Sequence, residues 1–211
     1  MYNNFIKRFL DIVLSALGII VLGLPMIIIA IIIKITSPGR VFFKQKRVGM
    51  HKTYFNLYKF RTMRTDTPCD MPTHMLENPE QYITKVGSFL RKSSFDELPQ
   101  LFNIVSGEMS VIGPRPALWN QEDLIAERDK YCANDVKPGL TGWAQINGRD
   151  ELEIAEKAKY DGEYVEKMSF MFDFKCFFWT IKSVINHEGV VEGGTGEIKK
   201  EKNEKKATLS K

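Results

Sequence analysis

The chain is short of the residues that most often build metal sites and nucleophilic centres. It has three cysteines and three histidines in 211 residues. Cys69, Cys132 and Cys176 are widely separated and form no CxxC pair, which argues against a disulfide framework or a zinc site and favours a reducing compartment. The sequence also lacks G-x-S-x-G, H-E-x-x-H and Walker motifs. Carboxylates must therefore carry any chemistry.

Excess charge of one sign is also scarce. The formal net charge is only +4, the basic residues adjoin an apolar segment, and no known nucleic-acid-binding module is present. We therefore expect no nucleic-acid partner. The hydrophobic fraction of 44% and the mean hydropathy of −0.22 indicate a mostly globular chain of one catalytic unit.

One long hydrophobic run is present, and it lies near the N-terminus. Residues 12–33, "IVLSALGIIVLGLPMIIIAIII", carry no charge and exceed the ~20 residues needed to cross a hydrocarbon core. A signal peptide has an apolar core of only ~7–15 residues and a small-residue cleavage site, which this segment lacks. The run therefore predicts a membrane helix.

Two topologies remain open for this helix, a simple span and a re-entrant bend. Pro25 removes a backbone donor near the middle of the run and kinks or breaks a helix there. Lys7 and Arg8 precede the run, and Lys34 and Arg40 follow it, so both flanks look cytoplasmic by the positive-inside rule. A span satisfies only one flank, whereas a hairpin that dips into the inner leaflet satisfies both, provided that the broken backbone groups find partners.

The rest of the chain predicts an α/β fold that is mostly helical. Two alternating segments, 41–48 and 53–63, predict a β-hairpin joined at 49–52. Helical spacing follows at 79–92, from near Ser93, at 118–132, at 152–168 and at 169–186. Segments 107–116 and 138–151 look irregular, the latter because of its glycines.

Three parts of the chain follow from these patterns. Residues 1–36 form the membrane-inserted helix, residues 37–189 the catalytic domain and residues 190–211 a flexible charged tail. The aromatic segment 169–186 fits a helix at a lipid interface and an ordinary core helix about equally well.

"SSFDELPQL" places two carboxylates side by side, Asp96 and Glu97. Helix capping is the ordinary explanation, because Ser94 and Glu97 match S-x-x-E. A catalytic role is favoured by the shortage of other reactive groups and by basic side chains able to converge on an anion such as pyrophosphate. Those basic residues are Lys44, Lys46, Arg47, Lys59, Arg61 and Arg115.

The segments "YFNLYKFRTM", "RKSSFDELPQLFNIVSGEMSVIGPRP" and "VKPGLTGWAQINGR" closely resemble the signatures of the bacterial sugar transferases, which are monotopic phosphoglycosyl transferases. The likeness covers nearly the whole chain, with several long motifs in the right order. It implies a re-entrant N-terminal helix, a small hairpin sheet and interfacial amphipathic helices, at the cytoplasmic face of the bacterial inner membrane. Two positions depart from the family pattern: Glu108 stands where many relatives carry Asp, and Leu24 where relatives often have Ser before the proline.

The resemblance implies transfer of a sugar 1-phosphate from a UDP-sugar to undecaprenyl phosphate or another polyprenyl phosphate, with release of UMP. It makes Asp96 the nucleophile of a covalent aspartyl phospho-sugar, and Asp96 and Glu97 the Mg²⁺ ligands. A carboxylate is an established nucleophile for phosphoryl groups, and a hard cation bridges carboxylate and phosphate oxygens. An N-acetylated hexosamine is the expected sugar, with glucose or galactose second.

Five further residues are expected to bind substrate. Lys59 and Arg61 lie two apart, the spacing for one face of a strand, although either could instead contact lipid headgroups. Arg115, between two prolines, is expected to bind phosphate, and Gln145 and Arg149 to bind uridine or diphosphate. Trp143 would supply a stacking surface, although a structural loop explains 143–149 equally well.

Membrane lipids are the remaining expected partner, and the oligomeric state stays open, a homo-oligomer included. The main alternative function is a membrane-bound nucleotide-sugar hydrolase, which would use the same acids and Mg²⁺ with water as the acceptor. A non-catalytic membrane scaffold would need neither carboxylate.

Overall fold

A computed structural model describes residues 2–67, 79–148 and 152–185. The fold is mostly helical with a small antiparallel hairpin sheet, as the sequence predicts, and it contains a second small sheet that the sequence does not predict. The predicted tail at 190–211 and Arg149 lie outside the described residues.

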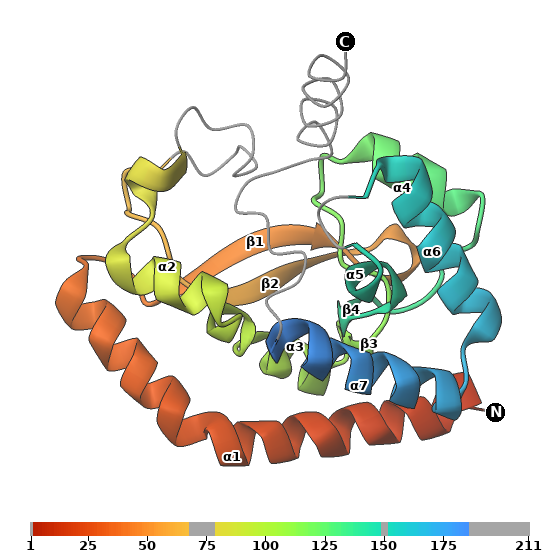
Figure 1. The fold of residues 1–211 in the computed structure, drawn as a ribbon, viewed down its shortest axis with the longest axis horizontal. Coiled ribbons are helices and arrows are strands. Elements are labelled where there is room, and N and C mark those ends of the chain that lie inside the picture. The colour runs from red at the N-terminus through yellow and green to blue at the C-terminus, as the bar shows by residue number, and fades with distance from the viewer. Residues whose placement is uncertain (1, 68–78, 149–151, 186–211) are drawn as a thin grey trace, which may run out of the picture.

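Helix α1 (Lys7–Thr36) underlies the molecule and bends part-way along its length (Figure 1). It is preceded by a short π-helix, η1 (Tyr2–Ile6), and contains Pro25, the residue type that most often bends a helix. Only 11% of its most apolar window is buried, so α1 is not the core helix of a soluble domain. Its length and composition suffice to cross a membrane.

One stripe of α1 packs against the rest of the protein. Its buried residues follow the spacing of a helix face and begin with three polar ones, Lys7, Asp11 and Ser15, before Met26 and Ile33. Met26 and Ile33 join a core cluster with Phe60 and Leu90. The other sides of α1 expose large apolar side chains, among them Phe9, Leu17, Ile20, Val21, Leu24, Ile27 and Ile35.

The predicted hairpin is confirmed. Strand β1 (Phe42–Val48) pairs antiparallel with β2 (Tyr54–Phe60) through the short 3-10 helix η2 (Met50–Lys52). Phe55 and Leu57 alternate with exposed residues on β2 and enter the core beside α3 (Gln100–Ser106). Lys59, near the end of β2, is thereby brought to the start of α3.

The predicted helix at 79–92 divides into η4 (Pro79–Tyr82) and α2 (Lys85–Lys92), because Thr84 is extended and caps α2 by accepting from the Gly87 amide. The predicted helix at 118–132 is shorter, α4 (Glu122–Asp129). Helices α6 (Ile154–Lys167) and α7 (Phe170–Ile185) confirm the last two helical segments.

Two segments expected to be irregular contain regular structure. Residues 107–116 include β3 (Ser110–Ile112), and residues 138–151 include β4 (Gly139–Thr141) and α5 (Trp143–Ile146). Strands β3 and β4 pair in parallel. Glycine allows this pairing, because a Cβ at Gly139 or Gly142 would collide with the backbone of Gly113. The carboxyl ends of the two parallel strands therefore place the loop 113–116 beside Gly142 and the start of α5.

Helix α7 is a surface helix that runs alongside the N-terminal part of α1 (Figure 1). Asp173 and Cys176 are buried, whereas the opposite face exposes Phe170, Met171, Phe174, Phe178 and Trp179. A fully buried core helix is therefore excluded.

Candidate active site

The two adjacent carboxylates lie in a short 3-10 helix, η5 (Phe95–Glu97), just before α3. Asp96 and Glu97 are both buried, with 8% of each residue exposed. Ser94 adopts a left-handed backbone conformation (φ 57°) and its side chain makes no capping hydrogen bond, so the capping explanation fails. The backbone turn at Ser94 instead directs both acids into the protein.

Glu97 is held by two cations. Lys59 Nζ lies 2.8 Å from Glu97 Oε1, and an Arg115 terminal nitrogen lies 2.7 Å from the same oxygen. The other terminal nitrogen of Arg115 is 3.5 Å from Oε2. Such charge-assisted bonds in a largely buried setting fix the carboxylate in position.

Asp96 has no comparably short ion pair among the described residues; its nearest cation, Lys59 Nζ, is 3.9 Å from Oδ2. Burial raises the pKa of Asp96, the Lys59 charge lowers it, and the Glu97 charge raises it again, with a net upward shift. Arg91 and Arg115 also lower the pKa of Asp96. Asp96 is thus a buried carboxylate surrounded by cations and close to a second acid, a combination common at functional sites.

Arg91 was missed as a candidate from the sequence. It lies on α2, and its Nε donates to Thr62 Oγ1 at 2.9 Å. One feature of the sequence does point to Arg91: it lies five residues before Asp96, within the same motif. A short turn at 93–94 separates α2 from η5. This turn brings the charge of Arg91 near the acidic dyad, Asp96 and Glu97.

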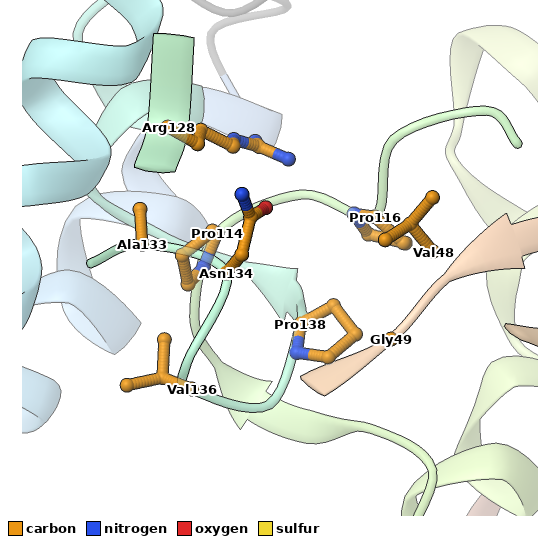
Figure 2. Close-up of a pocket in the computed structure, with 9 residues that line it drawn as sticks. All are labelled: Val48, Gly49, Pro114, Pro116, Arg128, Ala133, Asn134, Val136 and Pro138. Carbon is orange, nitrogen blue, oxygen red and sulfur yellow. The ribbon is translucent and has the colours of Figure 1, made fainter. Parts of the chain in front are cut away.

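Arg115 reaches the dyad from the loop after β3. Pro114 and Pro116 restrict the loop, and the Pro114 carbonyl accepts from the Gly139 amide at 2.8 Å. Behind the loop lies a cavity of about 10 Å³ lined by both prolines, Arg128 and Asn134 (Figure 2). This volume holds one water at most, so the cavity is too small for a substrate.

The structure places Arg61 elsewhere. Its guanidinium donates to the carbonyls of Ser37 and Pro38, directly after the end of α1, and burial lowers its pKa. Lys59 and Arg61 therefore do not meet at one anion in this structure. Arg61 holds the exit of α1 against the end of β2.

Gln145 lies on α5, beside the loop that carries Arg115. Neither side-chain amide atom is exposed, and neither has a hydrogen-bond partner in the described part of the chain. A buried amide without partners is costly, which fits a group that a ligand or water completes. Trp143 donates to Glu163 at 3.1 Å and packs against Phe172 with the ring centroids 5.0 Å apart and the rings tilted by 52°, so it has a structural role.

The other basic candidates lie along β1. Lys44 and Lys46 are exposed and face the rings of Tyr58 and Tyr54 at 5.1 and 4.1 Å. Arg47 donates to the Pro116 carbonyl at 2.9 Å and so supports the loop of Arg115.

The dyad fits a Mg²⁺ ion of the usual enzymatic kind. No group of three or more His, Cys, Asp or Glu side chains is assembled for a metal within the described ranges. Mg²⁺ needs no such cage, because it is commonly held by one or two carboxylates, waters and substrate phosphates. Asp96 and Glu97 supply adjacent carboxylates of this type.

A comparison with known families decides the identity. The bacterial sugar transferase family model matches residues 2–187. The chain belongs to the bacterial sugar transferase family. The matched range includes η5, the Arg115 loop, α1 and α7, so the sites described above lie within the family's common domain.

This bacterial sugar transferase is similar to several curated proteins. It is 41% identical over 192 residues to the UDP-glucose:undecaprenyl-phosphate glucose-1-phosphate transferase of Escherichia coli (strain K12), covering 87% of this chain and 41% of that protein. It is 44% identical over 158 residues to the uncharacterized sugar transferase EpsL of Bacillus subtilis (strain 168), covering 75% of each. It is 34% identical over 193 residues to an Aeromonas hydrophila UDP-N-acetylgalactosamine-undecaprenyl-phosphate N-acetylgalactosaminephosphotransferase, covering 88% of this chain and 45% of that protein. The chain thus spans less than half the length of the two relatives with named substrates.

Proposed function

We propose that this protein transfers a sugar 1-phosphate from a UDP-sugar to a polyprenyl phosphate, such as undecaprenyl phosphate, and releases UMP. The observation that carries the proposal is the buried acidic dyad in which Lys59 and Arg115 hold Glu97 while Asp96 lies beside them. The printed names of the Escherichia coli and Aeromonas hydrophila relatives support the reaction class.

The reaction proceeds in two displacements on one phosphorus. An Asp96 carboxylate oxygen attacks the sugar-bearing phosphorus, forming an O–P bond as the bond to UMP breaks. A phosphate oxygen of the polyprenyl phosphate then attacks the same phosphorus, and the bond to Asp96 breaks with the carboxylate restored. Splitting the transfer in this way lets two bulky substrates react in turn.

The cations around the dyad neutralise the diphosphate. Arg115 offers a planar, multiply donating group suited to phosphate oxygens, and Lys59 offers a point charge within reach of both carboxylates. Mg²⁺ held by Asp96 and Glu97 would supply further charge neutralisation at the phosphates. Gln145 and Arg149 remain predicted substrate ligands, and the unpartnered amide of Gln145 gives that residue structural support. Arg61 is instead engaged with the Ser37 and Pro38 carbonyls in this structure.

The structure supports a re-entrant α1. At its N-terminal end, Lys7 Nζ and the Tyr2 hydroxyl each donate to Asp173 Oδ2 on α7 at 2.6 Å. At its C-terminal end, Arg61 binds the Ser37 and Pro38 carbonyls. A helix whose two ends are held by one domain returns to the side from which it entered. We place that domain on the cytoplasmic face, as the basic flanks predict.

An assay of UMP release from UDP-sugars in lipid nanodiscs tests this function. UDP-glucose, UDP-galactose and UDP-N-acetylhexosamines are offered with and without undecaprenyl phosphate. We expect sustained UMP release and a lipid-linked sugar diphosphate only when the lipid phosphate is present, with one sugar class preferred. Full-rate release of free sugar phosphate without the lipid would instead establish the hydrolase.

A further inference from the structure

Asn103 on α3 is fully buried, with 0% of the residue exposed. All of its amide contacts are within the protein. Its Nδ2 donates to the Asn56 carbonyl at 2.8 Å and to Glu108 Oε2 at 2.7 Å, and its Oδ1 accepts from the Tyr58 amide at 3.0 Å. Both amide atoms are therefore satisfied.

Two of these bonds join α3 to β2. Strand β1 pairs with one edge of β2, and the other edge presents the Asn56 carbonyl and the Tyr58 amide. A neighbouring strand would ordinarily pair with both groups. The Asn103 side chain instead donates to the Asn56 carbonyl and accepts from the Tyr58 amide, so it satisfies the two groups that a neighbouring strand would otherwise pair with.

This junction lies between β2, which carries Lys59, and α3, which follows the acidic dyad of η5. Lys59 follows Tyr58 directly on β2, whereas Glu97 precedes α3 in η5. The distance of 2.8 Å between Lys59 Nζ and Glu97 Oε1 depends on how α3 sits against β2. We propose that Asn103 is a positioning residue, whose amide sets the Lys59–Glu97 contact and with it the placement of Asp96.

Glu108 selects the orientation of the amide. Its Oε2 accepts from Asn103 Nδ2 and, at 3.1 Å, from the Ser106 hydroxyl. A carboxylate accepts only, so Nδ2 must face Glu108 and Asn56, and Oδ1 must face the Tyr58 amide. Asparagine meets this pattern. An aspartate at position 103 has the same shape but would place a carboxylate oxygen against the Asn56 carbonyl and the Glu108 carboxylate, where no hydrogen is available for a bond.

The inference rests on the proposed function, so every variant is assayed beside the wild type for lipid-dependent UMP release. Asn103→Asp is expected to lower kcat on the order of 10²-fold, as ångström-scale misplacement of a catalytic group does, with little change in the KM for UDP-sugar. Adding Glu108→Gln supplies a donor toward position 103 and is expected to restore part of kcat. Glu108→Gln alone is expected to lower kcat less than Asn103→Asp.

A double-mutant cycle separates positioning from general stability. Lys59→Arg keeps the charge, so activity stays measurable. If the two residues are coupled, the fold-loss of kcat in the Lys59→Arg/Asn103→Asp double variant is clearly smaller than the product of the two single fold-losses. Asn134→Asp is the matched control, because the buried Asn134 amide donates to the Ile125 carbonyl and to Asp129, both at 2.8 Å. The fold-loss of kcat in the Lys59→Arg/Asn134→Asp double variant is expected to equal the product of the two single fold-losses.

The inference would be overturned if Asn103→Asp kept the wild-type kcat, or if its fold-loss of kcat simply multiplied with that of Lys59→Arg. Either result would leave the proposed reaction intact. If Asn103→Asp fails to fold, the Asn103→Asp/Glu108→Gln pair replaces it in the cycle, with the same two outcomes. Absence of lipid-dependent UMP release in the wild type would instead sink the proposed function.

Discussion

At the residue scale, the site distinguishes two neighbouring acids by their surroundings. Glu97 shares one oxygen between Lys59 and Arg115 at 2.8 and 2.7 Å, whereas Asp96 is 3.9 Å from its nearest ion-pair partner among the described residues. A carboxylate fixed by two cations is suited to hold charge in place, and one left with free lone pairs is suited to attack. The geometry therefore favours the proposed roles, with Asp96 as the nucleophile and Glu97 as the more firmly held acid.

Asp96→Asn is expected to reduce UMP release on the order of 10³-fold or more, because an amide is not a nucleophile toward phosphorus. The same substitution is not expected to lower the free energy of unfolding. Burial raises the pKa of Asp96 in the folded protein, so the ionised form opposes folding once the pH exceeds the ordinary aspartate value. Thermal melting at neutral pH is therefore expected at or above the wild-type temperature. Residual activity near wild type would remove Asp96 from the chemistry.

The acidic limb of kcat/KM is expected at a higher pH than an ordinary aspartate gives, since Asp96 must be ionised to attack and its pKa is raised. Lys59 lowers that pKa, so Lys59→Met should move the limb to still higher pH. Lys52→Met is the control, because Lys52 is exposed and pairs with Asp129 on α4. A limb that stays in place or moves to lower pH in Lys59→Met would contradict this assignment.

Arg115→Lys is expected to lower kcat/KM by about 10²-fold, although the charge is kept, because a lysine cannot replace the planar fork. Steady-state kinetics with UDP-sugar at saturating lipid phosphate measure the effect. Arg64→Lys serves as control, since Arg64 forms an exposed ion pair with Asp66. Equal effects of the two substitutions would argue that Arg115 does not contact phosphate.

At the element scale, strong periodicity made most elements predictable. The apolar run, the alternating hairpin and the last two helices each carry a pattern that their own residues determine. The three-residue strands β3 and β4 carry no such pattern. They exist because each pairs with the other, and because glycines let their backbones approach closely.

The site was predictable to the extent that its residues share motifs. Asp96, Glu97, Lys59 and Arg115 come together as expected, because they lie at the ends of neighbouring elements. Strand spacing predicts that Arg61 joins Lys59 on one face, but β2 ends at Phe60. The Ser37 and Pro38 carbonyls at the exit of α1 accept from Arg61 instead. Spacing along a strand could not reveal that competing partner.

The topology of α1 gives a prediction at this scale. Single cysteines at Tyr2 and Arg40, in a variant with the native cysteines replaced, are expected to react from the same side of sealed vesicles with an impermeant thiol reagent. The reason is that both ends of α1 are held by the same domain. Labelling from opposite sides would establish a spanning helix.

At the scale of the whole molecule, exposed apolar side chains concentrate on α1 and α7. Buried polar contacts tie both helices to each other and to the rest of the fold. Asp173 of α7 binds Lys7, Tyr2 and, at 2.9 Å, the Tyr164 hydroxyl of α6, and Asp11 of α1 accepts from Ser110 and Val111 of β3. The exposed apolar faces of both helices and the acidic dyad thereby belong to one packed structure. In the proposed reaction, this arrangement would let a lipid phosphate and a soluble nucleotide sugar meet without extraction of the lipid.

The proposed reaction requires a covalent bond between Asp96 and the sugar-bearing phosphorus. Purified protein is mixed with UDP-sugar and Mg²⁺ without polyprenyl phosphate, quenched, and analysed by intact mass and peptide mapping. We predict one equivalent of UMP and a mass increase of one sugar phosphate on the peptide that contains Asp96, lost when undecaprenyl phosphate is added and absent in Asp96→Asn. Unmodified protein throughout, with product formed only when both substrates are present together, would contradict the account.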